Sequence, residues 1–149
     1  FAKLNPEVQI KAFWDKKGAQ EIENPLPNLS FHKVNDQGFL EAMAACKGLI
    51  CTAGFESVCE AMYLGKPVVM VPVAGQYEQA CNALDGEQSG AGKKADFFDF
   101  EGLTLLPLPD ASDTATYQKW AESWPTEFQK LVYKKEPISQ NERPELVLN

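Results

Sequence analysis

The chain has 149 residues, of which 44% are apolar and 23% are charged, and its net charge is −7. This length and balance are typical of one globular domain with its own core. Phosphate backbones and anionic lipids bind clustered Lys and Arg, so we expect no nucleic-acid partner for an acidic chain. No apolar run approaches the roughly 20 residues of a membrane-spanning helix, and no signal peptide is evident.

The cysteines and the single histidine give little support to metal or nucleophilic chemistry. No C-x-x-C pair is formed by the cysteines, which are Cys46, Cys51, Cys59 and Cys81. Such isolated thiols among apolar residues are typical of buried side chains in a reducing compartment. His32 lies in a predicted strand, and we interpret it as structural or ligand-lining. We therefore expect no metal site and no other cofactor.

Strand and helix signals alternate along the first two thirds of the chain. Apolar, β-rich runs predict strands near 8–13, 29–34, 49–52 and 68–72. Helical spacing and glycine or proline stops predict helices over 37–47, 56–64 and 76–88. The spacer 16–28, rich in Pro, Asn and charge, predicts a loop, and 90–98 predicts a loop that leads into a short strand.

This alternation predicts the fold class: an α/β domain with a three-layer, Rossmann-like parallel sheet and helices on both faces. The domain is expected to span 1–136, with 137–149 as a tail. Residues 114–135 predict further helix, and Pro125 predicts the start of a second segment because proline fits a first helical turn. Positions predicted to be buried there are Trp120, Trp124, Phe128, Leu131 and Val132.

The stretch "CTAGFESVCEAMYLGKPVVMVP", residues 51–72, carries most of the functional signal. In a doubly wound sheet, ligands lie beyond the carboxyl ends of the strands, and the loop before the helix at 56–64 is in such a place. Gly54 has no Cβ to obstruct a ligand, the helix start offers free N–H groups, and Ser57 adds a hydroxyl. These features predict an anion site for a phosphate or diphosphate, although helix capping alone also explains a Gly-x-x-Ser turn.

Acidic and amide side chains accompany this predicted phosphate site. Glu60 lies four residues after Glu56 on one helix face, where a carboxylate can accept hydrogen bonds from ribose hydroxyls. Glu78 and Gln79 begin the next helix, at the mouth of the same crevice, and suit sugar hydroxyls. Asn82 is expected to cap or brace the loop and not to touch ligand. A solvated helix face remains the alternative explanation for each glutamate.

The stretch resembles the C-terminal half of a GT-B glycosyltransferase. It is similar to the bacterial N-acetylglucosaminyltransferases of peptidoglycan-precursor synthesis, and to UDP-glucuronosyl and plant UDP-glycosyl transferases. The shared pattern is a glycine loop, a Ser or Thr, a Glu three residues later, G-x-P, an apolar strand ending in Pro, and an acidic/Gln–Gln pair followed by N-A. These are Gly54, Ser57, Glu60, Gly65, Pro67, Pro72, Glu78, Gln79, Asn82 and Ala83.

The resemblance implies roles for individual residues. The diphosphate of the donor would be bound by Thr52, Ala53, Gly54, Phe55 and Ser57. Glu60 would bind ribose. The transferred sugar would contact Gln76, Glu78 and Gln79. The nucleobase would lie against Val34, Asn35 and Phe39. Plant relatives carry a phosphate-contacting histidine where this chain has Thr52, and a base-stacking tryptophan where it has Val34. The ribose assignment therefore rests on a closer match to the family than the phosphate and base assignments do.

The function implied is donor binding within a transferase of a hexose or N-acetylhexosamine from a nucleotide diphosphate sugar, with a UDP-sugar as the expected donor. The alternatives are a UDP-sugar epimerase of the same fold and a nucleotide-sugar-binding module without catalysis. The acceptor site and general base of such enzymes belong to an N-terminal domain, which nothing here matches, so we expect no catalytic residue and no activity in this fragment.

The chain begins at Phe1 and not at Met, and the family's first strand is expected before it. An open sheet edge would then favour a homodimer, or pairing of the tail segment "ELVLN" with that edge. We expect the whole protein to be cytoplasmic and metal-independent. Contact with the inner membrane, as a peripheral protein, is expected only through the missing domain.

Overall fold

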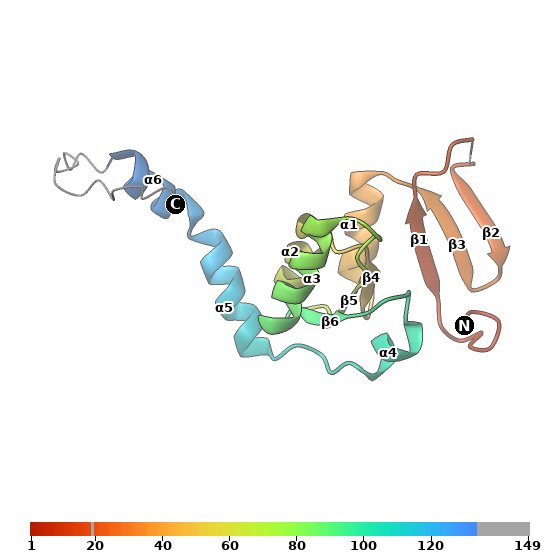
Figure 1. Ribbon diagram of the computed structural model, residues 1–149. Helices are drawn as coiled ribbons and strands as arrows, with labels where there is room; N and C mark the ends of the chain where they lie inside the picture. Colours follow the sequence, from red (N-terminus) through yellow and green to blue (C-terminus); the bar gives the residue numbers. More distant parts are fainter. Residues whose placement is uncertain (19, 134–149) are drawn as a thin grey trace, which may run out of the picture.

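Six short strands form two separate sheets in the computed structural model, which describes residues 1–18 and 20–133 (Figure 1). The first sheet has the order β1-β3-β2, with β1 at Ile10–Trp14, β2 at Ile22–Leu26 and β3 at Leu29–Lys33. The second has the order β4-β5-β6, with β4 at Leu49–Cys51, β5 at Val68–Met70 and β6 at Gly92–Lys94. The four strands expected from the sequence are therefore present, and so is the short strand after 90.

One strand runs against the others and was not predicted. β1 is parallel to β3, and β4, β5 and β6 are mutually parallel, but β2 is antiparallel to β3. The expectation of a loop over 16–28 is thus wrong. β2 carries Pro25 and its register shifts between Glu23 and Leu26. An edge strand tolerates both features because one side of its backbone needs no partner, so neither excludes a strand here.

The helices are α1 (Asp36–Ala45), α2 (Phe55–Tyr63), α3 (Tyr77–Gln88), α4 (Phe100–Leu105), α5 (Ala111–Glu122) and α6 (Trp124–Tyr133). The first three match the predicted ranges to within two residues. α2 ends as expected, because Gly65 has φ 62, a conformation that L side chains rarely adopt. The short helix α4 was not predicted.

The core lies between the second sheet and three helices. Val68 and Met70 are both 0% exposed and share one face of β5. On that face they cluster with buried residues of α1, α2 and α3, namely Met43, Val58, Ala61 and Ala83. Val69, also 0% exposed, projects to the other face. α4 packs against β4 and β5. The predicted α/β fold with a parallel, Rossmann-like sheet is confirmed.

Helix α1 contacts both sheets. Its residue Phe39 packs edge-on against Phe13 of β1, with ring centroids 5.3 Å apart. The same Phe39 packs on the core cluster of the second sheet, in which Met43 is buried. Because one helix rests on β1 and on the β4–β6 core, it holds the two sheets side by side.

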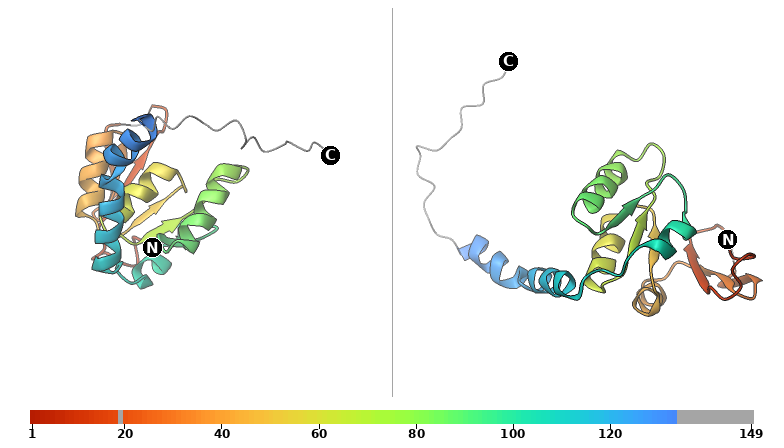
Figure 2. Two further views of the ribbon diagram at one scale, coloured as in Figure 1. Left: turned by 90° about the vertical axis from the view of Figure 1, so that its left-hand side faces the viewer. Right: turned by 90° about the horizontal axis from the view of Figure 1, so that it is seen from below.

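The C-terminal helices do not bury the positions that the sequence predicted. Trp120 is 68% exposed and Leu131 is 77% exposed. Trp124, Phe128 and Val132 are exposed as well. α5 contacts α2 and α6 contacts α5, and both helices extend away from the sheets (Figures 1 and 2). The helical pattern was correct, but no element of the described residues covers its apolar face. The predicted tail, 137–149, lies outside the described residues.

We predict that Gly92→Ala destabilises the fold strongly. A Cβ at this position would overlap the carbonyl oxygen of Val68 in the fully buried strand β5. The backbone of the buried strand β5 can shift only at a high cost in free energy. We therefore expect a loss of about 1–3 kcal/mol in the free energy of unfolding. Urea denaturation measures it. Gly54→Ala is the control, with a smaller loss of at most about 1 kcal/mol, since a Cβ there meets only Thr52 O at 3.7 Å. Equal stability of Gly92→Ala and the parent would contradict the pairing of β5 with β6.

Candidate functional site

Two helices begin at the same edge of the second sheet. β4 and β5 pair in parallel, with Leu49 opposite Val68 and Cys51 opposite Met70, so their carboxyl ends lie level. α2 follows β4 after three loop residues, and α3 follows β5 after six. The two helix starts are therefore neighbours at the edge where α/β proteins bind ligands.

Neither of these helix starts is capped by a side chain. The N-cap residues Gly54 of α2 and Gln76 of α3 make no side-chain cap hydrogen bond within the described residues. In contrast, side-chain oxygens cap α1, α4 and α5, through Asn35, Asp99 and Asp110. The first N–H groups of α2 and α3 are thus available to a ligand, and the positive ends of both helix dipoles point toward it.

An open depression of about 350 Å³ lies at this place, lined by Gly54, Phe55, Glu56, Ser57 and Glu78. It brings together three of the predicted phosphate residues and one of the predicted sugar residues. Thr52 is exposed beside it. Ala53 is 0% exposed, so only its backbone could face a ligand.

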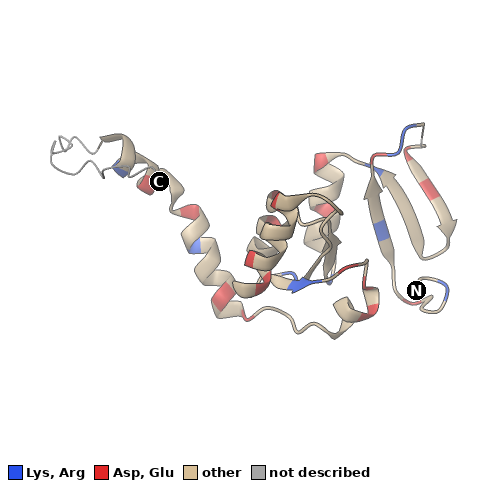
Figure 3. Cartoon of the chain, in the orientation of Figure 1, with Lys and Arg blue, Asp and Glu red and all other residues tan. Residues whose placement is uncertain are grey.

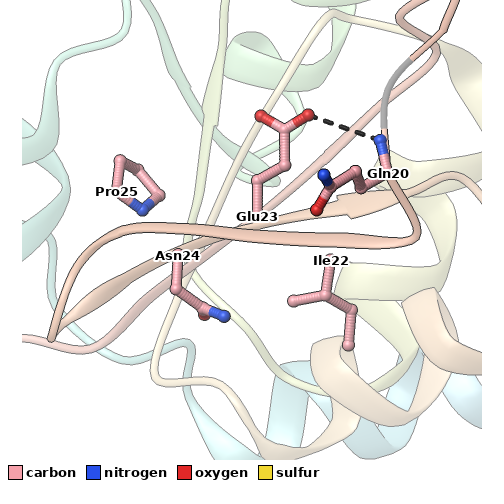
Figure 4. Close-up of a pocket in the computed structure, with 5 residues that line it drawn as sticks. All are labelled: Gln20, Ile22, Glu23, Asn24 and Pro25. Atoms are coloured by element: carbon pink, nitrogen blue, oxygen red, sulfur yellow. Dashed lines mark hydrogen bonds between the residues drawn. The ribbon is translucent and has the colours of Figure 1, made fainter.

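A larger depression of about 480 Å³ lies over β2, lined by Gln20, Ile22, Glu23, Asn24 and Pro25. Figure 4 shows that Glu23 and Pro25 project to one side of the strand, and Ile22 and Asn24 to the other. The polar groups do not converge on one point, and Glu23 Oε1 accepts from the N–H of Gln20 at 3.4 Å. We therefore place the candidate site at the start of α2 and not here.

Side chains of α3 brace the loops on either side of the depression. Asn82 Nδ2 donates to the carbonyl oxygen of Ala53 at 3.2 Å, which ties α3 to the loop before α2. Asn82 was expected to brace this loop, and the structure places it so. Gln79 Oε1 accepts from the N–H of Val73 at 2.9 Å. This bond leaves the Gln79 amide nitrogen as the group that can meet a sugar hydroxyl.

The predicted ribose residue lies just outside the depression. Glu60 is half-buried on α2, one turn after Glu56, and it does not line the depression. Gln76 is exposed at the start of α3. The structure thus places Glu60 on the helix that begins at the depression without showing a contact to it, so its ribose role stays a prediction.

The predicted base-contacting residues follow the carboxyl end of β3, with Phe39 inside α1. Val34 is exposed, and Asn35 Oδ1 accepts from the N–H of Gly38 at 2.7 Å as the cap of α1. Phe39 is half-buried against Phe13. His32, in the same strand, has its Nε2 2.8 Å from Ser30 Oγ and stacks on Phe13, which agrees with a structural role. Of the three predicted residues, Val34 offers the most open apolar surface.

Trp14 is a candidate that the sequence reasoning passed over. It ends β1, opposite Lys33 of β3, at the same edge as Val34. Its indole N–H is buried and has no hydrogen-bond partner among the described residues. The ammonium of Lys16 lies 4.6 Å from the ring centroid. An aromatic residue at the carboxyl end of a predicted strand was the signal available in "KAFW".

The charges around the depression are acidic. Glu56 and Glu78 both line it. Figure 3 shows acidic residues on α1, α2, α3 and α5, and basic residues on β1 and β6. Behind the loop, burial raises the pKa of the Cys51 thiol to about 11, so this thiol is neutral at pH 7. Polar recognition at the depression thus depends on N–H groups, hydroxyls and carboxylates.

Comparison with known proteins identifies the family. The model of glycosyl transferase family 1 matches residues 7–105, more than half of the chain. The chain belongs to this family. A relative is the UDP-N-acetylglucosamine--N-acetylmuramyl-(pentapeptide) pyrophosphoryl-undecaprenol N-acetylglucosamine transferase of Deinococcus radiodurans, 33% identical over 92 residues. The match covers 58% of this chain and 23% of that relative.

Solved structures agree on the fold. The glycotransferase of kitacinnamycin superposes with a TM-score of 0.69 and 19% identity, over 92% of this chain and 37% of that one. The glycosyltransferase SnogD from Streptomyces nogalater superposes with a TM-score of 0.58 and 20% identity. This match covers 88% of this chain and 38% of SnogD. The resemblance to GT-B glycosyltransferases is thereby confirmed, and the chain spans well under half the length of these relatives.

The described residues contain neither a metal-ligand cluster nor a membrane-spanning helix. In residues 1–18 and 20–133, no group of three or more His, Cys, Asp or Glu side chains could hold a metal ion. No helix in the same ranges is long and apolar enough to cross a bilayer.

We predict that Gly54→Ala weakens nucleotide binding at little cost in stability. Its φ of −69 suits alanine, and an added Cβ meets no atom of the chain closer than 3.7 Å. The methyl group would project where the depression receives a ligand. We expect about tenfold weaker binding of UDP, near 1.4 kcal/mol, and at most about 1 kcal/mol less stability because alanine is a poorer N-cap. Calorimetry and urea denaturation measure the two quantities. UDP affinity equal to that of the parent would exclude Gly54 from the site.

Proposed function

We propose that this chain is the C-terminal, donor-binding half of a glycosyltransferase that transfers a hexose or N-acetylhexosamine from a nucleotide diphosphate sugar. The observation that carries the proposal is the pair of helix starts without side-chain caps, α2 and α3, that adjoin one depression. Membership of glycosyl transferase family 1 supports the donor class. The roles proposed for individual residues rest on their positions and chemistry.

The diphosphate of the donor binds at the start of α2. The N–H groups of the first turn and the Ser57 hydroxyl donate to its oxygens, and Gly54 leaves room for close approach. As the bond from sugar to phosphate breaks, negative charge develops on the departing diphosphate. The helix dipole and the N–H groups stabilise that charge, so the step needs no metal ion from this chain.

The sugar and the nucleoside extend to either side of the diphosphate. Glu78 lines the depression, and the Gln79 amide nitrogen is available, so the two suit adjacent sugar hydroxyls. Glu60 accepts from the ribose hydroxyls, because side chains of a helix lean toward its N-terminus. The base lies at the carboxyl end of β3, near Val34 and Asn35.

A UDP-sugar is the donor we favour, because the bacterial relative is named for UDP-N-acetylglucosamine. That name also includes an undecaprenol-linked acceptor, which supports a cytoplasmic enzyme that meets the inner membrane peripherally. The acceptor site and general base would belong to an N-terminal domain, as the GT-B resemblance implies. The chain matches only 23% of that relative, which is consistent with a further domain.

Two alternatives make different predictions. A UDP-sugar epimerase of the same fold would interconvert UDP-sugars without an acceptor. A binding module without catalysis would hold the donor and never release a free nucleotide diphosphate. Activity of a longer protein that contains this chain and an acceptor domain would favour the transferase.

We predict that Glu60→Ala weakens UDP binding by roughly ten- to a hundredfold. Hydrogen bonds from two ribose hydroxyls to a carboxylate contribute on the order of 1.5 to 3 kcal/mol, which corresponds to that change in Kd. Alanine is a good helix former, so the fold should persist. Calorimetry with UDP measures binding, and circular dichroism checks folding.

Glu56→Ala is the matched control, because Glu56 is one turn earlier on the same helix. It lines the depression and carries the same charge as the diphosphate, so its loss should leave binding unchanged or slightly stronger. The ribose assignment is wrong if Glu60→Ala binds like the parent, or if Glu56→Ala is the weaker binder of the two.

We also predict that the 149-residue chain binds UDP-sugars but does not turn them over. The depression supplies donor contacts, and neither an acceptor site nor a base is assigned to this chain. Incubation with UDP-N-acetylglucosamine and a polyprenyl-linked acceptor, followed by chromatography, should show no UDP release. Release of UDP would show that the chain carries its own acceptor site, and a new UDP-sugar would favour the epimerase.

A further inference from the structure

The part of the chain that forms the candidate site carries almost no positive charge. Residues 48–91 include β4, β5 and both helix starts, and they contain five carboxylate side chains but one basic residue, Lys66. The carboxylates are those of Glu56, Glu60, Glu78, Asp85 and Glu87. Lys66 follows the C-terminal end of α2, where its Nζ donates to the carbonyl oxygen of Cys46 at 2.8 Å. The opposite end of α2, at which the depression lies, therefore receives no cationic side chain from this segment.

The basic residues of the second sheet lie on β6, as Figure 3 shows. They are Lys93 and Lys94, and neither lines the depression. β6 pairs with β5 on the side away from β4, so it lies two strands, about 10 Å, from the strand that leads into α2. Charges in water are screened over about 8 Å at physiological salt, so these lysines contribute little at the start of α2.

Two carboxylates without a cationic partner line the depression, those of Glu56 and Glu78. Both residues are exposed. The ion pairs of the described residues join Lys33 of β3 and Lys130 of α6 to other glutamates. Side chains of a helix lean toward its N-terminus, so a glutamate in the first turn extends over the helix start. A ligand in the depression therefore meets two negative charges that no cation of the described residues neutralises.

The proposed function gives no role to Glu56. Glu78 faces the hydroxyl groups of the sugar, whereas Glu56 carries the same charge as the diphosphate and cannot favour its binding. A glutamate in a first helical turn also stabilises its helix through the dipole. That effect concerns the stability of α2 and predicts nothing about a ligand, so the two roles can be separated by experiment.

We propose that Glu56 selects the donor by the charge of its sugar. The site prefers a nucleotide diphosphate sugar with a free amino group to one with a neutral sugar, and it discriminates against a uronic acid. A protonated amine donates charge-assisted hydrogen bonds to carboxylates. A carboxylate on the sugar would instead add negative charge beside Glu56 and Glu78, with no cationic partner at the depression. This inference rests on the proposed function, because it concerns the sugar of a donor whose diphosphate binds at the start of α2.

The diphosphate is common to all donors of one nucleotide, so its repulsion by Glu56 cancels when such donors are compared. In water, two unit charges about 4 Å apart change a Kd by about fivefold. Replacement of an attractive pair by a repulsive pair at that distance therefore corresponds to a difference of about 25-fold.

Calorimetry with three UDP-sugars of the same ring configuration tests the proposal. The sugars of UDP-glucosamine, UDP-glucose and UDP-glucuronate carry a positive charge, no charge and a negative charge in buffer of about pH 6. For the 149-residue chain we expect Kd to rise about fivefold at each step in that order. The ratio of the Kd of UDP-glucuronate to that of UDP-glucosamine, about 25, is the charge selectivity.

Variants of Glu56 separate charge selection from a structural role. Glu56→Gln keeps the size of the side chain and removes its charge, so the charge selectivity should fall at least about fivefold. Glu56→Lys reverses the charge, so UDP-glucuronate should become the tighter ligand of the two. A Glu56 that only stabilises α2 would change the urea denaturation of these variants and leave the charge selectivity as it is in the parent.

Asp85→Asn is the matched control. Asp85 is also exposed, and it lies seven residues after Glu78 on α3, about 10 Å further along the helix. This variant loses the same charge from the same segment at a distance where screening is strong. It should therefore keep the charge selectivity of the parent.

Three results would overturn the proposal while leaving the proposed function intact. Equal Kd values for the three sugars, in a chain that binds UDP, would show that the site does not distinguish sugar charge. Charge selectivity that persists in Glu56→Gln and is lost in Glu78→Gln would assign it to Glu78. Tightest binding of UDP-glucuronate by the parent would reverse the inference. If the parent binds neither UDP nor any of the three sugars, the proposed function fails, and this inference fails with it.

Discussion

The parallel pairing of β4 with β5 is the constraint on which the candidate site depends. It holds Cys51 opposite Met70, so α2 and α3 begin side by side. The buried strand β5 anchors the arrangement, because α2 and α3 both pack on its Val68–Met70 face. The bond from Asn82 to Ala53 O then joins one helix to the loop of the other. The site is thus formed chiefly by the backbone of two helix starts. Its side chains modify how the N–H groups of these helix starts can bind a ligand.

The acidic residues at the depression do not cancel the attraction of the helix starts for an anion. Each helix dipole contributes typically 0.3–1 kcal/mol to a charge at its end, and direct N–H hydrogen bonds to a charged group add about 1.5–3 kcal/mol. Glu56 and Glu78 are exposed, and in the high dielectric of water two unit charges about 4 Å apart interact by only about 1 kcal/mol. Their repulsion of a diphosphate is therefore the smaller effect. The same carboxylates remain useful acceptors for hydroxyl groups, which carry no charge to repel.

The elements that the sequence predicted well are those whose signal is local. The apolar run at β5 and the stop of α2 at Gly65 need only their own residues to be recognised. β2 was missed because Pro25 is tolerated only at an edge, and edge position is a property of the whole sheet. The five apolar residues of α5 and α6 showed an apolar face, but a pattern cannot say what covers it. Gln79 likewise looked free, because its partner Val73 is a backbone group of a neighbouring loop.

In the proposed complex, the two sheets would bind different parts of the donor. The start of α2 and Glu78 rest on β4 and β5, whereas Val34, Asn35 and Trp14 stand at the ends of β3 and β1. In the described residues, α1 is the main connection, and its contact between Phe39 and Phe13 sets how far the base end lies from the diphosphate end. A ligand that reaches only the diphosphate end needs one sheet in place. In the proposed complex a complete nucleotide would contact both sheets, so its binding would favour the arrangement of the two sheets that α1 maintains.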